Sequence, residues 1–260
     1  MTVSPAAREF AYLDSPIPLA FAHRGGAADG LENTMTAFAR AVSAGYRYLE
    51  TDVHATADGA LVAFHDPWLN RLTDRSGRIG ALPWEQVRKA KIGGVERIPL
   101  LEELLTAWPS LRVNIDIKAD AAVDPLVEVI RRTNAIDRVS VGSFSDARLV
   151  RVRAALGPRL CSSLGPRGVL RLRSAAWRGR NGAGGMPGVP LAQVPARFGI
   201  TVVDQRFIDH AHRLGMQVHV WTIDEPKEIN RLLDLGVDGI MTDRIDTLRE
   251  IYTARGLWAA

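Results

Sequence analysis

Short apolar runs alternate along the chain with segments in which apolar residues recur every three or four positions. The runs predict buried strands, and the recurring spacing predicts amphipathic helices. We expect strands at residues 19–22, 46–53, 112–118, 139–143, 159–163, 191–194, 200–203, 217–221 and 239–242. We expect helices at residues 34–44, 123–133, 146–156, 205–214, 225–235 and 245–254, with Thr34 as the N-cap of the first.

Alternation of strands and helices over the whole length predicts an α/β domain in which helices cover a parallel sheet. An open doubly wound sheet and a closed barrel compete. No glycine-rich dinucleotide-binding motif follows the first strand, and polar residues end nearly every strand, which favours a TIM (β/α)8 barrel. A barrel needs roughly 250 residues, so it would occupy residues 18–256 and leave residues 1–17 as an N-terminal extension.

Two segments interrupt the alternation. Residues 66–99 are too many for a simple loop and contain a short helical pattern at 83–90, so we expect a small insertion after the second strand, beside the barrel mouth. Residues 178–190 are rich in glycine and arginine, which is typical of a mobile surface loop.

The second and third strands carry the most informative polar residues. Glu50 and Asp52 are two positions apart and therefore share one face, and Asn114, Asp116 and Lys118 share a face in the same way. Two carboxylates pointing into a barrel repel each other, and either a divalent cation or a salt bridge relieves the repulsion. Lys118 suits a phosphate oxygen, or serves as a counter-ion to Asp116. A set of carboxylates without cysteine favours Mg²⁺ or Ca²⁺.

Two histidines stand at the ends of apolar runs near these carboxylates. His23 ends the first strand, and His65 follows the apolar run at 61–64. Such a pair could act as general base and general acid on a phosphodiester. Arg24 could hold a phosphate through two hydrogen bonds, although an arginine in this position could equally form a surface ion pair.

A resemblance now becomes apparent from an ordered set of motifs, which run from about Ala22 to Asp243. They are His23-Arg24-Gly25, Glu32-Asn33-Thr34, Glu50-x-Asp52, Thr56-x-Asp58-Gly59, His65-Asp66, Pro99-x-Leu101-Glu102-Glu103, Ile115-Asp116-Ile117-Lys118, Ser143-Phe144, Trp221-Thr222 and Asp238-Gly239-Ile240-Met241-Thr242-Asp243. Each motif is short, but together and in this order they resemble the glycerophosphodiester phosphodiesterase family.

The resemblance implies a TIM barrel with an inserted subdomain after the second strand, and hydrolysis of glycerophosphodiesters to an alcohol and glycerol 3-phosphate. In the family, the substrate's own glycerol hydroxyl can attack first and give a cyclic phosphate that water opens. The implied roles are acid/base catalysis for His23 and His65, metal ligation for Glu50, Asp52 and Asp116, and substrate binding for Arg24, Asn33, Lys118, Phe144 and Trp221. Glu32 and Asn33 would organise the loop after the first strand.

The chain departs from the family pattern at three places. Asp116 stands where glutamate is usual, so the third carboxylate is shorter and could reach the metal directly, through a water, or at a shifted metal position. Asp224 replaces an asparagine after Trp221-Thr222, and Ile245 replaces a proline after Thr242-Asp243. We expect the last two to alter the barrel rim rather than the chemistry.

Charge is distributed unevenly along the chain. Residues 147–203 contain ten arginines and no acidic residue, although the whole chain carries a net charge of only +4. With Leu170, Leu172 and Trp177 among them, these arginines could contact an anionic membrane, or could simply belong to a solvated helix and a glycine-rich loop. A lysophospholipase D or sphingomyelinase D-like activity on lipid phosphodiesters is therefore the alternative function.

Other classes are less favoured. Few aromatic residues accompany the arginines and no recognised motif is present, so we expect no nucleic-acid binding. A barrel that binds a ligand without catalysis is disfavoured because both histidines and the carboxylates are present. One cysteine, no run of roughly 20 apolar residues and no apolar run after a basic start in residues 1–15 predict a cytoplasmic enzyme.

Overall fold

Eight parallel strands form the centre of the computed structural model, which describes residues 9–179 and 183–258. The strands are β1 (Leu19–Ala22), β2 (Tyr48–Ala55), β6 (Arg112–Ile117), β7 (Val139–Gly142), β8 (Cys161–Ser162), β9 (Leu191–Pro195), β12 (Gln217–Trp221) and β13 (Gly239–Thr242). They pair in the order β8-β7-β6-β2-β1-β13-β12-β9. A parallel bridge between Ser163 and Leu191 joins the two outer strands, so the sheet is a nearly closed TIM barrel, as predicted.

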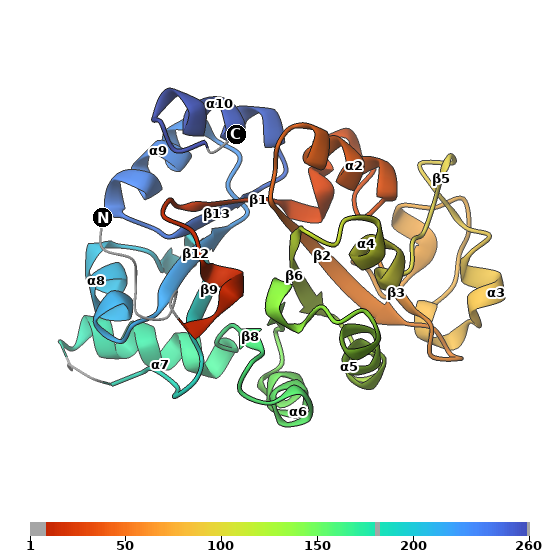
Figure 1. Ribbon diagram of the computed structural model, residues 1–260, viewed down its shortest axis with the longest axis horizontal. Helices are drawn as coiled ribbons and strands as arrows, with labels where there is room; N and C mark the ends of the chain where they lie inside the picture. Colours follow the sequence, from red (N-terminus) through yellow and green to blue (C-terminus); the bar gives the residue numbers. More distant parts are fainter. Residues whose placement is uncertain (1–8, 180–182, 259–260) are drawn as a thin grey trace.

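Helices surround the strands (Figure 1). They are α2 (Met35–Ser43), α4 (Leu101–Ala107), α5 (Val123–Arg132), α6 (Asp146–Leu156), α7 (Pro166–Trp177), α8 (Gln205–Arg213), α9 (Pro226–Leu235) and α10 (Ile245–Ala254). Thr34 caps α2 as expected, since its hydroxyl accepts a hydrogen bond from the amide of Ala37. Helix α4 was not predicted, and α7 was considered only as a solvated helix within the arginine-rich stretch. The buried face of α7 includes small residues such as Gly168 and Ala175, which give a weak hydrophobic signal.

The strand expected at residues 200–203 is wrong as part of the barrel. Its first half forms β11 (Ile200–Thr201), which pairs antiparallel with β10 (Arg197–Phe198) in a hairpin outside the barrel. Its second half, Val202 and Val203, is buried and donates both amides to the carbonyl of Ala196. One apolar run therefore divides between two environments, which periodicity cannot distinguish.

The predicted insertion lies at the edge of the helical ring, at the right of Figure 1. It follows β3 (Leu61–Ala63), which pairs antiparallel with β2, and it contains α3 (Trp84–Val87), β4 (Lys91–Ile92) and β5 (Glu96–Arg97). A separate apolar cluster holds it together, formed by Val62, Phe64, Leu69, Ile79, Val87, Ala90, Ile92 and Ile98. The segment is therefore a small subdomain with its own core.

Short 3-10 helices and turns complete the described chain. The 3-10 helices are Ala11–Leu13, His23–Gly25, Ala27–Asp29, Leu69–Arg71, Ile79–Ala81, Asp120–Ala122 and Ile136–Arg138. The surface loop expected at 178–190 includes residues 180–182, which lie outside the described residues. No helix in residues 9–179 and 183–258 is both long enough and apolar enough to cross a bilayer.

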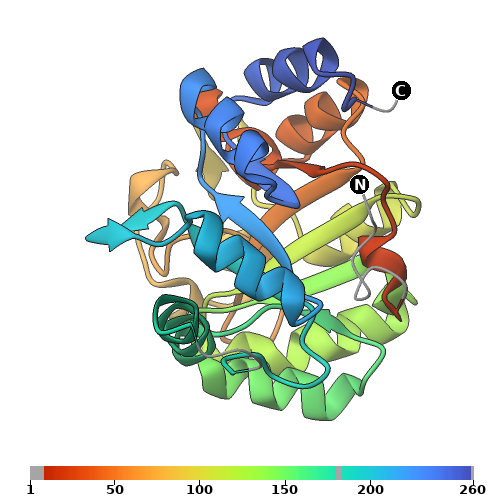
Figure 2. The same ribbon diagram turned by 90° about the vertical axis from the view of Figure 1, so that its left-hand side faces the viewer.

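The N-terminal segment packs against the barrel at the end opposite the mouth, at the right of Figure 2. Tyr12 and Leu13 are buried, the Tyr12 ring meets the Tyr48 ring edge to face at 5.4 Å, and the Tyr48 hydroxyl donates to the carbonyl of Tyr12 at 2.8 Å. Tyr48 begins β2, so the segment closes the base of the barrel. The boundary expected at residue 18 thus separates residues that share one core.

A histidine at the base should make the stability of the fold depend on pH. His212 Nε2 lies 2.8 Å from Asp238, whose carboxylate also accepts the Val218 amide, and this hydrogen bond raises the pKa of His212 despite partial burial. The stabilisation is full below the unfolded pKa, near 6.5, and is lost as pH rises through the higher folded pKa. We expect His212→Gln to lower the melting temperature by up to about 2 °C at pH 5.5 and hardly at pH 8.5.

Thermal melts of both proteins across this pH range measure the effect. His210, on the same helix, bonds a backbone carbonyl instead of a carboxylate, so His210→Gln serves as the control without this charge coupling. An equal loss for His212→Gln at both pH values would contradict the prediction.

Candidate active site

The inner face of β2 brings two carboxylates together at the centre of the mouth. Glu50 and Asp52 are 4% and 1% exposed, and the pairing of β2 with β6 sets Asp52 directly beside Asp116. Every residue of β2 is buried, because the strand has barrel interior on one face and helices on the other. The three residues expected to bind metal therefore lie on adjacent strands, as the alternation predicts.

Two cations offset part of this negative charge. Lys118 Nζ lies 2.9 Å from Asp52 Oδ1 and 2.7 Å from Asp116 Oδ2, and Arg24 Nε lies 3.0 Å from Asp52 Oδ2. Burial raises the pKa of Asp52, but Lys118 and then Arg24 outweigh it, so the pKa is lower than usual. The interpretation of Lys118 as counter-ion to Asp116 thus describes this arrangement.

The negative charges of Glu50 and Asp116 are less fully balanced by neighbouring cations and hydrogen-bond donors. Burial, and then the charge of Asp52, raise the pKa of Glu50 to about 7, although Glu50 accepts the Arg24 amide at 3.0 Å. Asp116 Oδ1 is buried without a hydrogen-bond partner. Unpaired carboxylate oxygens in a buried site fit a hard divalent cation. Among the described residues, however, no group of three acidic, histidine or cysteine side chains is arranged to bind a metal ion. In this arrangement the Lys118 ammonium group lies between the carboxylates of Asp52 and Asp116.

Asn33 donates a hydrogen bond to the Asp52 carboxylate and fixes its orientation. Its side chain is fully buried, with the amide nitrogen 3.0 Å from Asp52 Oδ2 and the amide oxygen accepting the Thr51 hydroxyl at 2.7 Å. Both ends of the amide are engaged by β2. Asn33 was expected to bind substrate, but its contacts are those of a residue that orients a carboxylate.

A tight turn after β1 brings the backbone of Arg24 against Glu50. Arg24 has a φ of 51° and Gly25 a φ of 83°, both in the left-handed region. A Cβ on Gly25 would lie 2.9 Å from the backbone of Ala37 and Phe38 in α2, so only glycine fits. The glycine of the His23-Arg24-Gly25 motif thus allows this turn to pack closely on α2.

His23 is oriented by a carboxylate from the far end of the chain. Its Nδ1 lies 2.6 Å from Asp243 Oδ1, while its Nε2 lies 3.7 Å from Glu50 Oε2. Burial lowers the pKa of His23, but Glu50 and the hydrogen bond to Asp243 more than offset this, so the pKa is raised. Asp224 in turn accepts the Asp243 amide and the Thr242 hydroxyl, each at 2.8 Å. The substitution at 224, expected to affect only the rim, therefore touches the residue that orients His23.

His65 has an equivalent partner. Its Nδ1 lies 2.6 Å from Asp66 Oδ1, and Arg71 binds both oxygens of Asp66 at 2.6 and 2.9 Å. Arg71 also reaches Glu32, which accepts from Arg24 at 2.9 Å. The hydrogen bonds from Arg71, ahead of the one from His65, lower the pKa of Asp66 to about 2. One chain of ion pairs thus links the two loops that carry the histidines.

Two aromatic residues line one side of the mouth. The Phe144 and Trp221 rings meet edge to face at 5.6 Å, and Lys118 Nζ lies 5.7 Å from the centre of the Phe144 ring. Phe144 is 65% exposed, whereas Trp221 is partly buried. Of the two residues predicted to line the leaving-group side, Phe144 therefore adjoins the cation beside the carboxylates, and Trp221 packs against Phe144.

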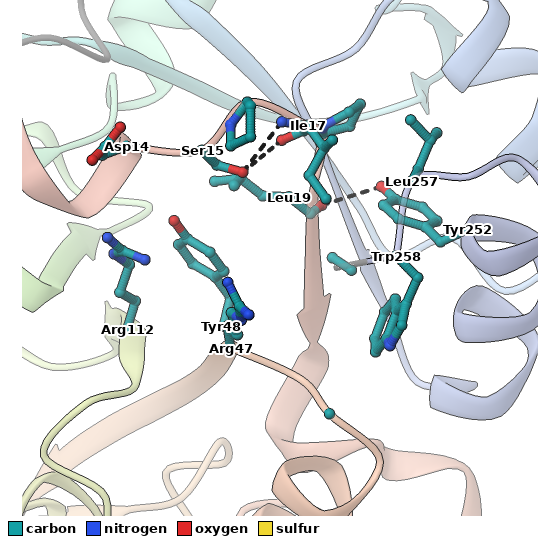
Figure 3. Close-up of a pocket in the computed structure, with 14 residues that line it drawn as sticks. Asp14, Ser15, Ile17, Leu19, Arg47, Tyr48, Arg112, Tyr252, Leu257 and Trp258 are labelled. Carbon is teal, nitrogen blue, oxygen red and sulfur yellow. Dashed lines mark hydrogen bonds between the residues drawn. The ribbon is translucent and has the colours of Figure 1, made fainter. Parts of the chain in front are cut away.

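A different hollow lies at the base of the barrel, with Arg47, Tyr48 and Arg112 on one side and Leu257 and Trp258 on the other (Figure 3). Its volume is about 150 Å³. No histidine is among the described residues that line it, so these residues do not bring the histidine groups found at the mouth.

The sequence prediction missed Asp243 and Arg71 as members of the site. Asp243 belongs to the Thr242-Asp243 motif that supported the resemblance, so a signal for it was present. Arg71 lies in the insertion, where no strand periodicity places a side chain. Only the fold shows that it spans the two histidine loops.

Two histidines beside paired cations are suited to general acid/base chemistry on an anionic ester, whose charge the cations could neutralise. Fold and site thus define a barrel hydrolase that acts on phosphoric diesters. The model of the glycerophosphoryl diester phosphodiesterase family matches residues 23–247, and the chain belongs to this family.

Known proteins agree with this classification. A probable glycerophosphodiester phosphodiesterase 2 from Mycobacterium tuberculosis is 44% identical over 92% of both chains. A human lysophospholipase D is 29% identical over 88% of this chain and 84% of its own. The crystal structure of a glycerophosphoryl diester phosphodiesterase from Silicibacter pomeroyi, itself named putative, has a TM-score of 0.81 at 25% identity and covers 96% of this chain and all of its own.

Removal of the charge on Asp243 should impair catalysis. We expect Asp243→Asn to lower kcat roughly 10²-fold or more, because the histidine tautomer is no longer held. Asp243 raises the pKa of His23, so removal of its charge should also shift the limb of the pH profile that depends on His23 to lower pH. Steady-state kinetics across pH measure both effects.

Asp246→Asn is the matched control, since Asp246 is exposed on α10, where it pairs with Arg249 at 3.6 Å. Unchanged turnover and an unshifted profile in Asp243→Asn would show that Asp243 has no part in orienting His23.

Proposed function

We propose that the protein hydrolyses glycerophosphodiesters to glycerol 3-phosphate and an alcohol, using His23 and His65 as the acid/base pair. The observation that carries the proposal is that a carboxylate engages Nδ1 of each histidine, at 2.6 Å in both. Nε2 of each ring is then the nitrogen that can exchange a proton with the substrate, and in His23 it also lies 3.7 Å from Glu50 Oε2. The M. tuberculosis relative carries the corresponding name, and an Oleispira antarctica phosphodiesterase of the same fold (TM-score 0.78, 23% identity) has a structure with the product sn-glycerol-3-phosphate.

In the proposed reaction Arg24 and Lys118 bind the phosphate oxygens. One histidine removes a proton from the attacking hydroxyl, which belongs either to water or to the glycerol moiety of the substrate. The other donates a proton to the departing alcohol oxygen as the phosphorus–oxygen bond breaks. When glycerol attacks, a cyclic phosphate forms and water opens it, so one water is consumed in either case.

Glu50, Asp52 and Asp116 are the residues that would hold a divalent cation. The unpartnered Asp116 oxygen and the raised pKa of Glu50 support such a ligand set, and their oxygen chemistry suits Mg²⁺ or Ca²⁺. A bound cation would neutralise charge on the phosphate and on the attacking oxygen. Lys118 would then shift from Asp52 and Asp116 toward the phosphate.

A second candidate function is lysophospholipase D activity. Phe144, two-thirds exposed beside Trp221, gives the mouth an apolar wall that a lipid substrate could contact. The human relative bearing this name supports the candidate. The same acid/base pair would serve, because only the group attached to the phosphate differs.

Substitution of either histidine should abolish most turnover while the fold is retained. We expect His23→Ala and His65→Ala each to lower kcat by roughly 10²-fold or more. Melting temperature and kcat are measured together, and His212→Ala provides a histidine control outside the mouth. Near-wild-type turnover in either mutant would remove that histidine from the mechanism.

Removal of divalent cations should abolish activity and one added metal should restore it. A coupled assay for glycerol 3-phosphate, run with glycerophosphocholine, glycerophosphoethanolamine, glycerophosphoinositol and glycerophosphoglycerol, tests reaction and cofactor together. We expect turnover with Mg²⁺ or Ca²⁺ and none with EDTA. Full activity in EDTA would refute the metal proposal. Choline release from lysophosphatidylcholine, without turnover of any of the four, would favour the second candidate.

A further inference from the structure

The hairpin β10-β11 exposes two large apolar side chains at the barrel mouth. Phe198 is 82% exposed and Ile200 is 54% exposed, and they are direct register partners across the turn at Gly199. Cross-strand partners point to the same face, so the two side chains form one apolar tip. The hairpin projects from the left of the molecule in Figure 2, away from the N-terminal segment that closes the base.

The base of the hairpin is firmly attached. The Ala196 carbonyl accepts the amides of Val202 and Val203 at 3.0 and 3.2 Å, and all three residues are buried. The exposed tip is therefore held on an ordered support at the end of β9. Large apolar groups kept in water at such a position mark an interaction surface.

Other exposed aromatic residues border the same mouth. Phe144 follows β7, and Trp68, 53% exposed, lies in the insertion close to Arg71, which reaches Glu32 in the first loop. These residues and the hairpin tip come from three different segments of the barrel, which follow β3, β7 and β9.

The charge near the hairpin is positive. Arg167 and Arg206 lie in the first turns of α7 and α8, which begin at the mouth, and Arg197 lies in the hairpin itself. All three are exposed, and none forms a salt bridge with a described carboxylate. The carboxylate of Glu228 forms an ion pair with Arg231 at 2.6 Å, which neutralises its charge. Arg231 and, more weakly, Arg197 lower the pKa of Glu228. Apolar tips beside unpaired arginines complement an anionic lipid surface.

The arginine-rich stretch as a whole is not this surface. Four of its arginines pair with aspartates outside the stretch: Arg148 with Asp120, Arg151 with Asp124, Arg159 with Asp137 and Arg173 with Asp204. Leu172 is fully buried, and Arg180 lies outside the described residues. Two exposed parts of the stretch are left to consider. One is Arg167 and Arg197 with the hairpin tip at the mouth, and the other is the outer face of α7, where Leu170 and Trp177 are 68% and 67% exposed.

We propose that the β10-β11 hairpin inserts Phe198 and Ile200 into an anionic bilayer, so that the mouth docks against the lipid surface. Two apolar side chains are too few for a stable protein interface, which buries at least about 1,000 Å². They suffice for reversible membrane contact when arginines add attraction to lipid headgroups. Helix α7 lies in the ring of helices around the strands (Figure 1), so docking on its outer face would leave the mouth open to water.

Sedimentation of the full chain with vesicles tests the proposal. We expect binding to vesicles of equal parts phosphatidylcholine and phosphatidylglycerol that weakens as salt is added. The double variant Phe198→Ser/Ile200→Ser should bind roughly tenfold less or weaker still. Arg197→Gln should bind about fivefold less, the loss expected for one basic residue at an anionic surface.

The matched control is Leu170→Ser/Trp177→Ser, which removes two equally exposed apolar groups from the α7 face. It should bind as well as the wild type. Loss of binding in this variant with retention in the hairpin variant would overturn the proposal, as would absence of wild-type binding to anionic vesicles. Equal binding to pure phosphatidylcholine would overturn the choice of an anionic surface.

Turnover of a water-soluble glycerophosphodiester separates docking from catalysis. Both double variants should match the wild type with the soluble substrate, which also shows that they fold. A parallel loss of soluble turnover in the hairpin variant would place Phe198 and Ile200 in substrate binding and overturn the docking role. Vesicle binding by a wild-type protein that turns over no glycerophosphodiester would refute the proposed function alone.

Discussion

Burial of two like charges on one strand is the constraint that organises the mouth of this barrel. Glu50 and Asp52 point inward from β2, where water does not neutralise them, and Asp116 adds a third carboxylate from the next strand. Arg24 and Lys118 are drawn to these carboxylates. The left-handed turn at Arg24 and the close packing of Gly25 on α2 follow from the same requirement, because the Arg24 amide must reach Glu50.

The histidines are placed by a second layer of charge around this centre. Asp243 and Asp66 each hold an imidazole nitrogen, and Asp224 and Arg71 hold these aspartates in turn. The layer draws on the first loop, the insertion and the last strand. A catalytic barrel can therefore tolerate large sequence changes on its outer helices, provided that the ends of these segments keep their charges.

The barrel and the central carboxylates could be predicted from the sequence because both depend on strand periodicity. Alternation alone placed Glu50, Asp52 and Asp116 on one side of their strands, and the pairing of β2 with β6 confirms that they adjoin. Longer-range relations escaped prediction. Arg71 contacts Glu32, which is distant in the sequence and is brought close only by the fold. The side chain of Asn33 binds the carboxylate of Asp52. The apolar run at 200–203 leaves the barrel sheet, because its first half pairs in the β10-β11 hairpin.

The pairing between β8 and β9 is the weakest strand pairing in the barrel. Strand β8 has two residues and meets β9 through a single bridge, whereas β2 and β6 are in register over six pairs. Amide protons along this joint are therefore protected by fewer hydrogen bonds, and local opening, with faster hydrogen exchange, is easiest there. Strand β9 also carries the exposed hairpin, so a force applied to the hairpin at a surface acts on the strand at the barrel's weakest joint.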